Sequence, residues 1–160
     1  MEPVPKTKAW FTAQVIQHQA ALFRVARAIL SSDEDAEDAV QDAILSAYTR
    51  LDTLQDPAKF KPWLLRILVN QCYTLCRKER PTVDLSAVED TLPAEGQDPA
   101  ESLTLRQAVS QLPQNLRAAI TLFYYEDYSV RQIARILSLS EAAVKTRLSR
   151  GREYLRRLVS

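Results

Sequence analysis

The sequence predicts an all-α protein of two small helical domains joined by an acidic, flexible linker, with a helix-turn-helix in the C-terminal domain. Helical periodicity runs through nearly the whole chain, and alternating strand patterns are missing. Residues 81–101 interrupt it with three prolines, six acidic residues and no aromatic residue, so they cannot bury enough apolar surface to fold. The predicted domains are therefore residues 1–80 and 102–160, with residues 81–101 as the linker.

The net charge of +1 conceals an uneven distribution along the chain. The N-terminal domain carries +1, the linker −6 and the C-terminal domain +6. Repulsion among its acidic residues should extend the linker. The excess of cations makes the C-terminal domain the expected nucleic-acid-binding part.

The N-terminal domain is predicted to contain three helices. The first covers approximately residues 10–30, and the second follows Ser32, which can cap it, with acidic residues in the first turn where the helix dipole favours them. The third begins near Pro62, which suits a first turn, and runs to about residue 80. The residues expected to face inward are Leu22, Val25, Ala26 and Ile29 on the first helix, Ala36, Ala39, Val40, Ala43, Ile44, Ala47 and Leu51 on the second, and Leu64, Ile67, Leu68, Cys72 and Leu75 on the third.

The outward face of the second helix combines carboxylates, an amide and an exposed leucine. These residues are Asp35, Asp38, Gln41, Asp42 and Leu45. The combination suits a docking strip for a basic helical partner, recognised through charge. A solvated helix face is the alternative interpretation.

Another face of the third helix offers chemistry for single-stranded or partly opened nucleic acid. Trp63 and Tyr73 provide stacking surfaces. Arg66 and Arg77 can contact phosphates, and Asn70 can contact a base edge.

The loop before the third helix adds charge and an aromatic ring. The residues are Lys59, Phe60 and Lys61. Because aromatic residues near a helix start are more often core residues than stacking platforms, a packing role is the favoured interpretation of Phe60 and Trp63.

In the C-terminal domain, two helices precede the helix-turn-helix. The first is expected near residues 102–112, and Pro113 ends it. The next helix carries the apolar stripe Leu116, Ala119, Ile120 and Phe123.

Residues 128–157 have the pattern of a helix-turn-helix. Ser129 and Gln132 form a capping box, and Ser140 can cap the second helix. The apolar residues at helical spacing are Val130, Ile133, Ala134 and Leu137 on the first helix, and Val144, Leu148, Gly151, Leu155 and Leu158 on the second. The opposite side of the second helix presents Ala142, Lys145, Thr146, Ser149 and Arg150.

The second helix of this pair is the expected DNA reader. Residues 145–157 contain six cations and one anion, a balance that gains affinity for DNA through counterion release. Small residues such as Thr146 and Ser149 let the backbone approach base edges, while Lys145 and Arg150 are long enough to reach guanine or phosphate. A solvated amphipathic helix is the alternative, but caps, turn and support helix together favour DNA binding.

Other functional classes have little support. Cys72 and Cys76 are the only cysteines and His18 is the only histidine, so no catalytic residue, metal site or cofactor is expected. Small core residues are the favoured interpretation of the cysteines, with a redox or partner-shared metal role as the alternative. No apolar run approaches the roughly 18 residues of a membrane span, and no signal peptide is recognisable, so a cytoplasmic protein is expected.

The two domains together resemble an extracytoplasmic function (ECF, group IV) sigma factor of bacterial RNA polymerase. The resemblance covers roughly residues 20–158, with the motifs in the family's order. It rests on DEDAEDAVQDAILSAY at 33–48, FKPWLLRILVNQCYTLCRKER at 60–80 and LPQNLRAAITLFYYEDYSVRQIARILSLSEAAVKTRLSRGREYL at 112–155.

The resemblance implies a role for each cluster of residues. In the family, the acidic strip grips the clamp helices of the polymerase's largest subunit, which implies this role for Asp35, Asp38, Gln41, Asp42 and Leu45. The third helix and its preceding loop hold open the minus-ten promoter element, which implies DNA contacts from Lys59, Phe60, Lys61, Trp63, Arg66, Asn70 and Arg77. The recognition helix reads the minus-thirty-five element, which implies contacts from Lys145, Thr146, Arg147, Ser149 and Arg150. The acidic linker resembles the family's linker, which lies in the path by which RNA leaves the polymerase.

The sequence departs from the family pattern at three places. Pro62 stands before the tryptophan where a small or hydroxylated residue is more common. Ser138 occupies a turn position usually held by glycine, which costs on the order of 1 kcal/mol if the backbone is left-handed there. Ala142 and Ala143 replace a common Gly-Thr pair, so base preference at that point is open.

The expected function is therefore that of a promoter-specificity subunit with no catalysis of its own. Its expected partners are core RNA polymerase, promoter DNA and an anti-sigma protein, with no small-molecule substrate. A helix-turn-helix repressor with an N-terminal sensing or dimerisation domain is the main alternative. A redox or metal enzyme using Cys72 and Cys76 is the weaker one.

Overall fold

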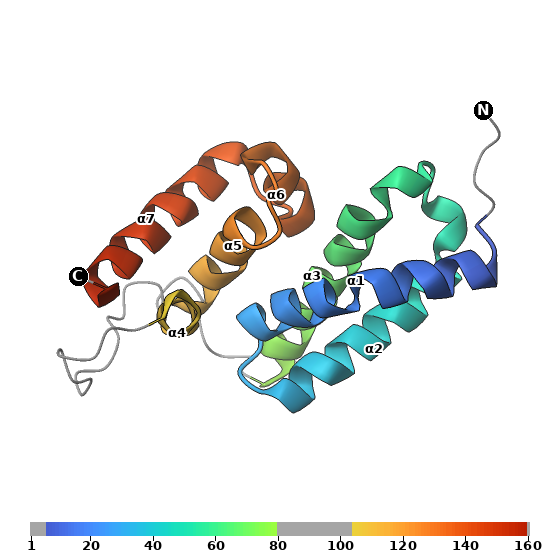
Figure 1. The fold of residues 1–160 in the computed structure, drawn as a ribbon, viewed down its shortest axis with the longest axis horizontal. Helices are drawn as coiled ribbons and strands as arrows, with labels where there is room; N and C mark the ends of the chain where they lie inside the picture. Colours follow the sequence, from blue (N-terminus) through green and yellow to red (C-terminus); the bar gives the residue numbers. More distant parts are fainter. Residues whose placement is uncertain (1–5, 80–103, 160) are drawn as a thin grey trace. The chain divides into compact units, whose positions relative to one another are not determined.

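The computed structural model describes residues 6–79 and 104–159, and the predicted acidic linker at 81–101 lies outside them. All regular structure in the described residues is helical, which confirms the all-α prediction (Figure 1). The chain divides into two compact units, Met1–Glu79 and Arg80–Ser160. None of the described helices combines the length and the apolar character that a membrane span requires.

Three long helices pack against one another in the first unit (Figure 1). They are α1 (Lys8–Ile29), α2 (Asp33–Thr49) and α3 (Phe60–Glu79), and two short 3-10 helices, η1 (Leu51–Thr53) and η2 (Pro57–Lys59), connect α2 to α3. The Ser32 hydroxyl accepts a hydrogen bond from the Asp35 amide at 3.1 Å, as its position before the acidic turn predicts. Arg27 donates to the Leu30 carbonyl at 2.8 Å and pairs with Asp33 at 2.7 Å, which ties the corner between α1 and α2.

The core of the first unit follows the predicted stripes with two adjustments. All four predicted residues of α1 are buried. For the second helix, the predicted residues Ala36, Ala39, Val40, Ala43 and Ala47 are buried. Ile44 and Leu51, which lies in η1, are half-buried. On α3, Ile67 and Leu75 are half-buried, whereas the unpredicted pair Leu65 and Val69 is buried. Helix α3 contacts both α1 and α2. These two helices cover a wider part of its surface than the single apolar stripe that was predicted.

An aromatic cluster surrounds Phe60 at the start of α3. The Phe60 ring lies 5.4 Å from Trp10, 5.7 Å from Phe11 and 5.9 Å from Trp63, between centroids, and it is 1% exposed. This burial corrects the expectation that Phe60 contacts nucleic acid and agrees with the packing interpretation. Trp63 is half-buried, at the edge of the cluster.

Residues 104–159, the described part of the second unit, form four helices, and the last two are the helix-turn-helix (Figure 1). They are α4 (Leu105–Ser110), α5 (Gln114–Tyr124), α6 (Val130–Leu137) and α7 (Glu141–Val159). Helix α4 is shorter than predicted because Thr104 forms a capping box with Gln107 and thereby sets its start. The core joins α5, α6 and α7 through residues that include Leu116, Ile120, Ile133, Val144 and Leu148.

The predicted caps of the helix-turn-helix are present. The Ser129 hydroxyl accepts from the Gln132 amide at 3.2 Å, while the Ser129 amide donates to the Gln132 side chain at 2.8 Å. Ser140 accepts from the Ala143 amide at 3.1 Å. Between the helices, Ser138 adopts the left-handed conformation, with φ 57° and ψ 47°, which is the condition under which a cost was expected for a serine in place of glycine.

Replacing Phe60 with alanine should destabilise the first unit by about 3 to 5 kcal/mol, because it removes the centre of the aromatic cluster and leaves a cavity. Urea denaturation followed by circular dichroism measures the loss. Tyr48→Ala is the matched control, since its ring is 46% exposed and contacts only the edge of the cluster, at Phe11. Equal losses for the two variants would contradict the assignment of Phe60 to the core.

Replacing Ser138 with glycine should stabilise the second unit by about 0.5 to 1 kcal/mol, because glycine adopts positive φ without strain. The melting temperature should therefore rise. Ser129→Gly is the control: its φ is −73° and its hydroxyl caps α6, so this change should lower the melting temperature instead. A fall for both variants would show that Ser138 is not strained.

Candidate nucleic-acid interface

The outward side of α7 presents polar and basic side chains to solvent. Lys145, Thr146, Ser149 and Arg150 are all exposed, opposite the buried residues Val144, Leu148 and Gly151. The Thr146 hydroxyl donates to the Ala142 carbonyl at 3.0 Å. This bond uses the hydroxyl hydrogen within the helix, so an oxygen acceptor and a methyl group remain for outside contacts.

Arg147 differs from the other four residues of the predicted minus-thirty-five set. It is half-buried, and its Nη1 donates to the backbone carbonyl of Asn115 on α5 at 3.2 Å. Its DNA contact, which only the resemblance implied, stays a prediction, and the structure adds a contact with α5 that the sequence did not show. Sequence reasoning missed this because Asn115 lies 32 residues away.

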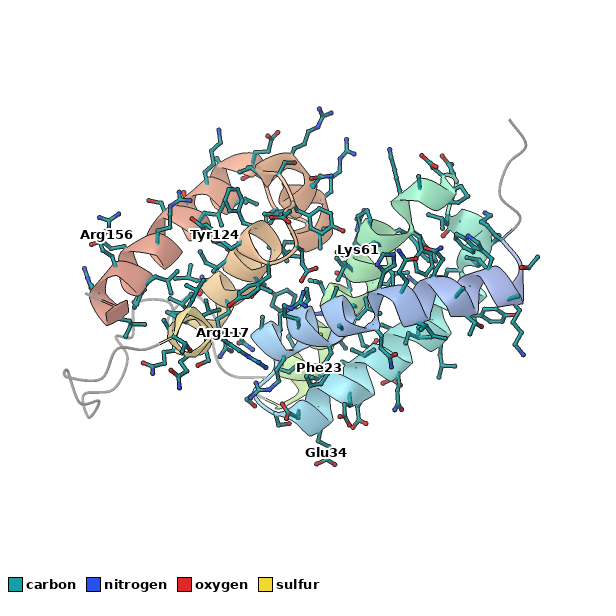
Figure 2. All side chains as sticks on the ribbon, viewed as in Figure 1. Phe23, Glu34, Lys61, Arg117, Tyr124 and Arg156 are labelled. Atoms are coloured by element: carbon teal, nitrogen blue, oxygen red, sulfur yellow. The ribbon has the colours of Figure 1, made fainter. Side chains whose placement is uncertain are left out.

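The C-terminal half of α7 uses several of its cations within the second unit. Glu153 pairs with Arg156 at 3.6 Å and with Arg157 at 3.8 Å, although these exposed pairs contribute little to stability. Arg152 donates to the hydroxyl of Tyr124 on α5 at 3.4 Å. Tyr124 is labelled in Figure 2. Lys145 and Arg150, nearer the N-terminal half of α7, are both exposed.

Helix α6 carries two exposed cations that sequence reasoning overlooked. Arg131 and Arg135 lie one turn apart, on the side away from the buried residues Ile133, Ala134 and Leu137. In helix-turn-helix proteins the first helix crosses the DNA backbone, where cations contact phosphates. Their spacing of four residues on the polar side of α6 was the signal that could have identified them.

The predicted minus-ten residues of α3 share one helix face. Arg66, Asn70 and Arg77 are exposed, and Trp63 and Tyr73 are half-buried. The Arg77 guanidinium lies 3.4 Å from the Thr74 hydroxyl, which in turn donates to the Asn70 carbonyl at 2.9 Å. Stacking surface and cations therefore alternate along about four turns of helix, as single-stranded nucleic acid requires.

Two sets of interactions hold the loop that leads into α3. The Asp56 carboxylate accepts from the Ala58 amide at 3.0 Å, and Pro57 fixes the backbone of the next position. The Lys6 amine donates to the backbone carbonyls of Leu51 and Leu54. This anchoring presents Lys59, which is exposed, and Lys61, which is half-buried in the first turn of α3 (Figure 2).

The predicted docking strip on α2 lies opposite its buried alanines. Asp38, Gln41 and Asp42 are exposed, Asp35 is half-buried, and Leu45 is 67% exposed. Asp42 accepts a long hydrogen bond from Gln71 of α3, at 3.4 Å. A leucine this exposed beside carboxylates provides both an apolar anchor and charge for a basic partner.

The two cysteines of α3 differ in burial, and Cys72 is the buried one. Burial, and to a smaller extent the neighbouring Cys76, raises the pKa of the Cys72 thiol to about 12, so the thiol stays protonated at neutral pH. Cys76 is half-buried. In residues 6–79 and 104–159 no three histidine, cysteine or acidic side chains are grouped as a metal site requires.

Comparison with known families accounts for both units. Residues 15–82 match the family Sigma-70 region 2, and residues 102–155 match the family Sigma-70, region 4. The ECF RNA polymerase sigma factor SigM of Mycobacterium tuberculosis is 35% identical over 147 residues, which cover 89% of this chain and 74% of the relative. SigW of Bacillus subtilis is 30% identical over 152 residues, which cover 85% of this chain and 81% of the relative.

Solved structures show the same fold. The sigma factor RpoE of Bartonella quintana, in complex with the anti-sigma factor NepR, has a TM-score of 0.72 and 27% identity, covering 92% of this chain and 95% of RpoE. CnrH, in complex with the cytosolic domain of CnrY, has a TM-score of 0.67 and 28% identity, covering 96% of this chain and 89% of CnrH. With regions 2 and 4 matched in order and relatives identical at 30% or more over most of their length, this chain belongs to the ECF sigma factors of RNA polymerase.

Proposed function

We propose that this chain is a group IV sigma factor that works in the cytoplasm with core RNA polymerase, recognises minus-thirty-five and minus-ten elements, and helps to open the promoter. The observation that carries the proposal is the exposed polar face of α7, in the unit that matches sigma region 4. The chain performs no catalysis of its own. Its binding energy positions the polymerase and offsets the cost of strand separation.

The second unit reads the minus-thirty-five element in this proposal. Helix α7 enters the major groove, where Lys145 and Arg150 reach guanine edges or phosphates and Thr146 and Ser149 contact bases at short range. Cations on the support helix α6, at Arg131 and Arg135, bind the adjacent backbone. The phosphate contacts set register, and the base contacts set preference.

The first unit binds the opened minus-ten element. The proposed contacts come from exposed or half-buried residues of α3 and its preceding loop: Lys59, Lys61, Trp63, Arg66, Asn70 and Arg77. A base extruded from the duplex is held in the loop before Trp63, as extruded bases are held in other proteins. The buried Phe60 supports this loop from beneath.

The acidic strip on α2 docks on the clamp helices of the polymerase's largest subunit. Asp35, Asp38, Gln41 and Asp42 supply charge and hydrogen-bonding groups, and Leu45 supplies an apolar anchor. Exposed carboxylates would steer the encounter and exclude acidic surfaces. Burial of the leucine in the complex would contribute about 1.5 to 3 kcal/mol.

An anti-sigma protein controls this sigma factor. RpoE and CnrH, which share its fold, were each solved with such a partner or with the cytosolic domain of CnrY. Exposed apolar side chains on both units, such as Leu45, Leu105 and Tyr124, offer surface that such a partner can cover.

Run-off transcription with purified core polymerase on a library of promoters tests the proposal. The chain should direct transcription from a subset of promoters that share two elements, and sequencing of the products identifies both. A symmetric operator that the chain protects from cleavage without polymerase would instead support a repressor.

Replacing Lys145 or Arg150 with alanine should cost about 1 to 3 kcal/mol of binding free energy and relax preference at particular bases of the minus-thirty-five element. Competition binding of the holoenzyme to the selected promoter and its single-base variants measures both effects. Arg106→Ala, an exposed cation on α4, is the matched control and should leave preference unchanged. An equal loss on every sequence would mean that the residue contacts phosphate alone.

Replacing Asp38 and Asp42 with arginine should abolish binding to core polymerase, because two attractive contacts become repulsive. Both side chains are exposed, so the fold and its circular dichroism spectrum should be retained. Co-purification with tagged core polymerase measures binding. The control is Asp52→Arg with Asp56→Asn, which reverses one acidic residue and neutralises another elsewhere in the first unit while keeping a side-chain acceptor for the Ala58 amide, and it should co-purify as the unaltered chain does.

A further inference from the structure

We infer that Arg147 and Gly151 are positioning residues that fix the depth and rotation of the recognition helix α7 against α5, and that neither contacts DNA. The inference rests on the proposed function, in which the outward side of α7 reads the minus-thirty-five element. It assigns a different task to one cation of the predicted DNA-binding set. It also explains why a glycine stands inside the long helix α7.

The Arg147 contact joins two helices that are far apart in the sequence. Its guanidinium donates to the carbonyl of Asn115, in the first turn of α5, at 3.2 Å. The side chain is half-buried, whereas Lys145, Ser149 and Arg150 on the same helix are exposed. A guanidinium held at a fixed carbonyl restrains rotation of α7 about its own axis, because rotation would break the bond.

The Gly151 contact lies one helical turn further along the same side of α7. A β-carbon placed at Gly151 would lie 2.6 Å from Cγ1 and 2.7 Å from Cδ1 of Ile120, closer than real β-carbons approach other atoms. Ile120 is 1% exposed, so a shift of its side chain would have to displace other atoms of the packed core. Glycine is unfavourable inside a helix, and its presence here is explained by the close approach of the α7 backbone to Ile120.

The two contacts act together because they are separated along both helices. Arg147 and Gly151 are four residues apart on α7, and Asn115 and Ile120 are five residues apart on α5. Two separated points of contact determine how one helix crosses another. The proposed reading residues Ser149 and Arg150 lie between the two contacts, and Thr146 directly precedes Arg147, so the position of this segment sets their reach toward the bases.

Displacement of α7 should weaken contacts with the edges of DNA bases more than contacts with the DNA backbone. A bidentate contact to a base edge requires matched distances at two atoms, whereas a cation attracts a phosphate over a longer range. A side chain added at residue 151 must push α7 away from α5 or distort the core. Preference for the minus-thirty-five sequence should then fall while general affinity for DNA is largely kept.

A double-mutant cycle between Gly151→Ala and Ile120→Ala tests the close approach in the full chain. Gly151→Ala should lower the melting temperature of the otherwise unaltered protein, because the new methyl group meets Ile120. In the Ile120→Ala background the same change should raise the melting temperature, because space is available and alanine favours the helix. The same shift in both backgrounds would overturn the role of Gly151. If Gly151→Ala alone unfolds the second unit, the double variant still gives the decisive comparison.

The salt dependence of promoter binding tests Arg147. Polymerase holoenzyme is assembled with each variant, and binding is measured from low to high salt on a selected promoter and on a copy with a scrambled minus-thirty-five element. Arg150→Ala should reduce the slope of log affinity against log salt by about 1 if Arg150 contacts a phosphate. Arg147→Ala should leave the slope unchanged and reduce the preference for the intact element by about tenfold.

Three outcomes of the salt-dependence measurement lead to different conclusions. A slope reduced by about 1 for Arg147→Ala would assign Arg147 to a phosphate and overturn its positioning role. An unchanged slope together with unchanged preference would also overturn that role. If the unaltered holoenzyme itself ignores the scrambled element, the proposed function of α7 fails, and the melting-temperature cycle still decides whether Gly151 sets the packing of α7 on α5.

Discussion

Close packing of helices at small side chains is the constraint on which both units depend. Each unit has about 80 residues, a size at which a single core is only marginally stable. Gly151 lets α7 lie against Ile120 in the second unit. In the first unit, α2 meets its neighbours through alanines that are at most 1% exposed: Ala36, Ala39, Ala43 and Ala47. Short distances between backbones bring many atoms into dispersion contact, which offsets the small volume of these side chains.

This packing leaves one side of each functional helix for polar chemistry. The exposed sides of α2, α3 and α7 differ in charge: acidic on α2, basic with aromatic rings on α3, and basic with small residues on α7. Charge determines which polymer each surface attracts, so a single helical architecture serves a protein partner and two forms of DNA in the proposed function. The cores need only apolar volume, and they place few restrictions on the outward residues.

The sequence alone determined the fold class, the caps and the family. Ser32, Ser129 and Ser140 were recognised as caps because a cap depends on residues within three positions, and those residues are visible in the sequence. The left-handed backbone at Ser138 was suggested only by the glycine that the family usually has at this position. The exposed sides of α2 and α7 followed from periodicity, since one apolar stripe fixes which residues face outward.

Only the tertiary structure showed which residues surround Phe60, Arg147 and Gly151. Periodicity could not show that the Phe60 ring is enclosed by Trp10 and Phe11, because those residues lie on another helix far away in the sequence. The cation of Arg147 looked like its exposed neighbours until its partner carbonyl on α5 was known. A long-range contact depends on how helices cross, and helix crossing is set by the packing of the whole core, which no local pattern in the sequence records.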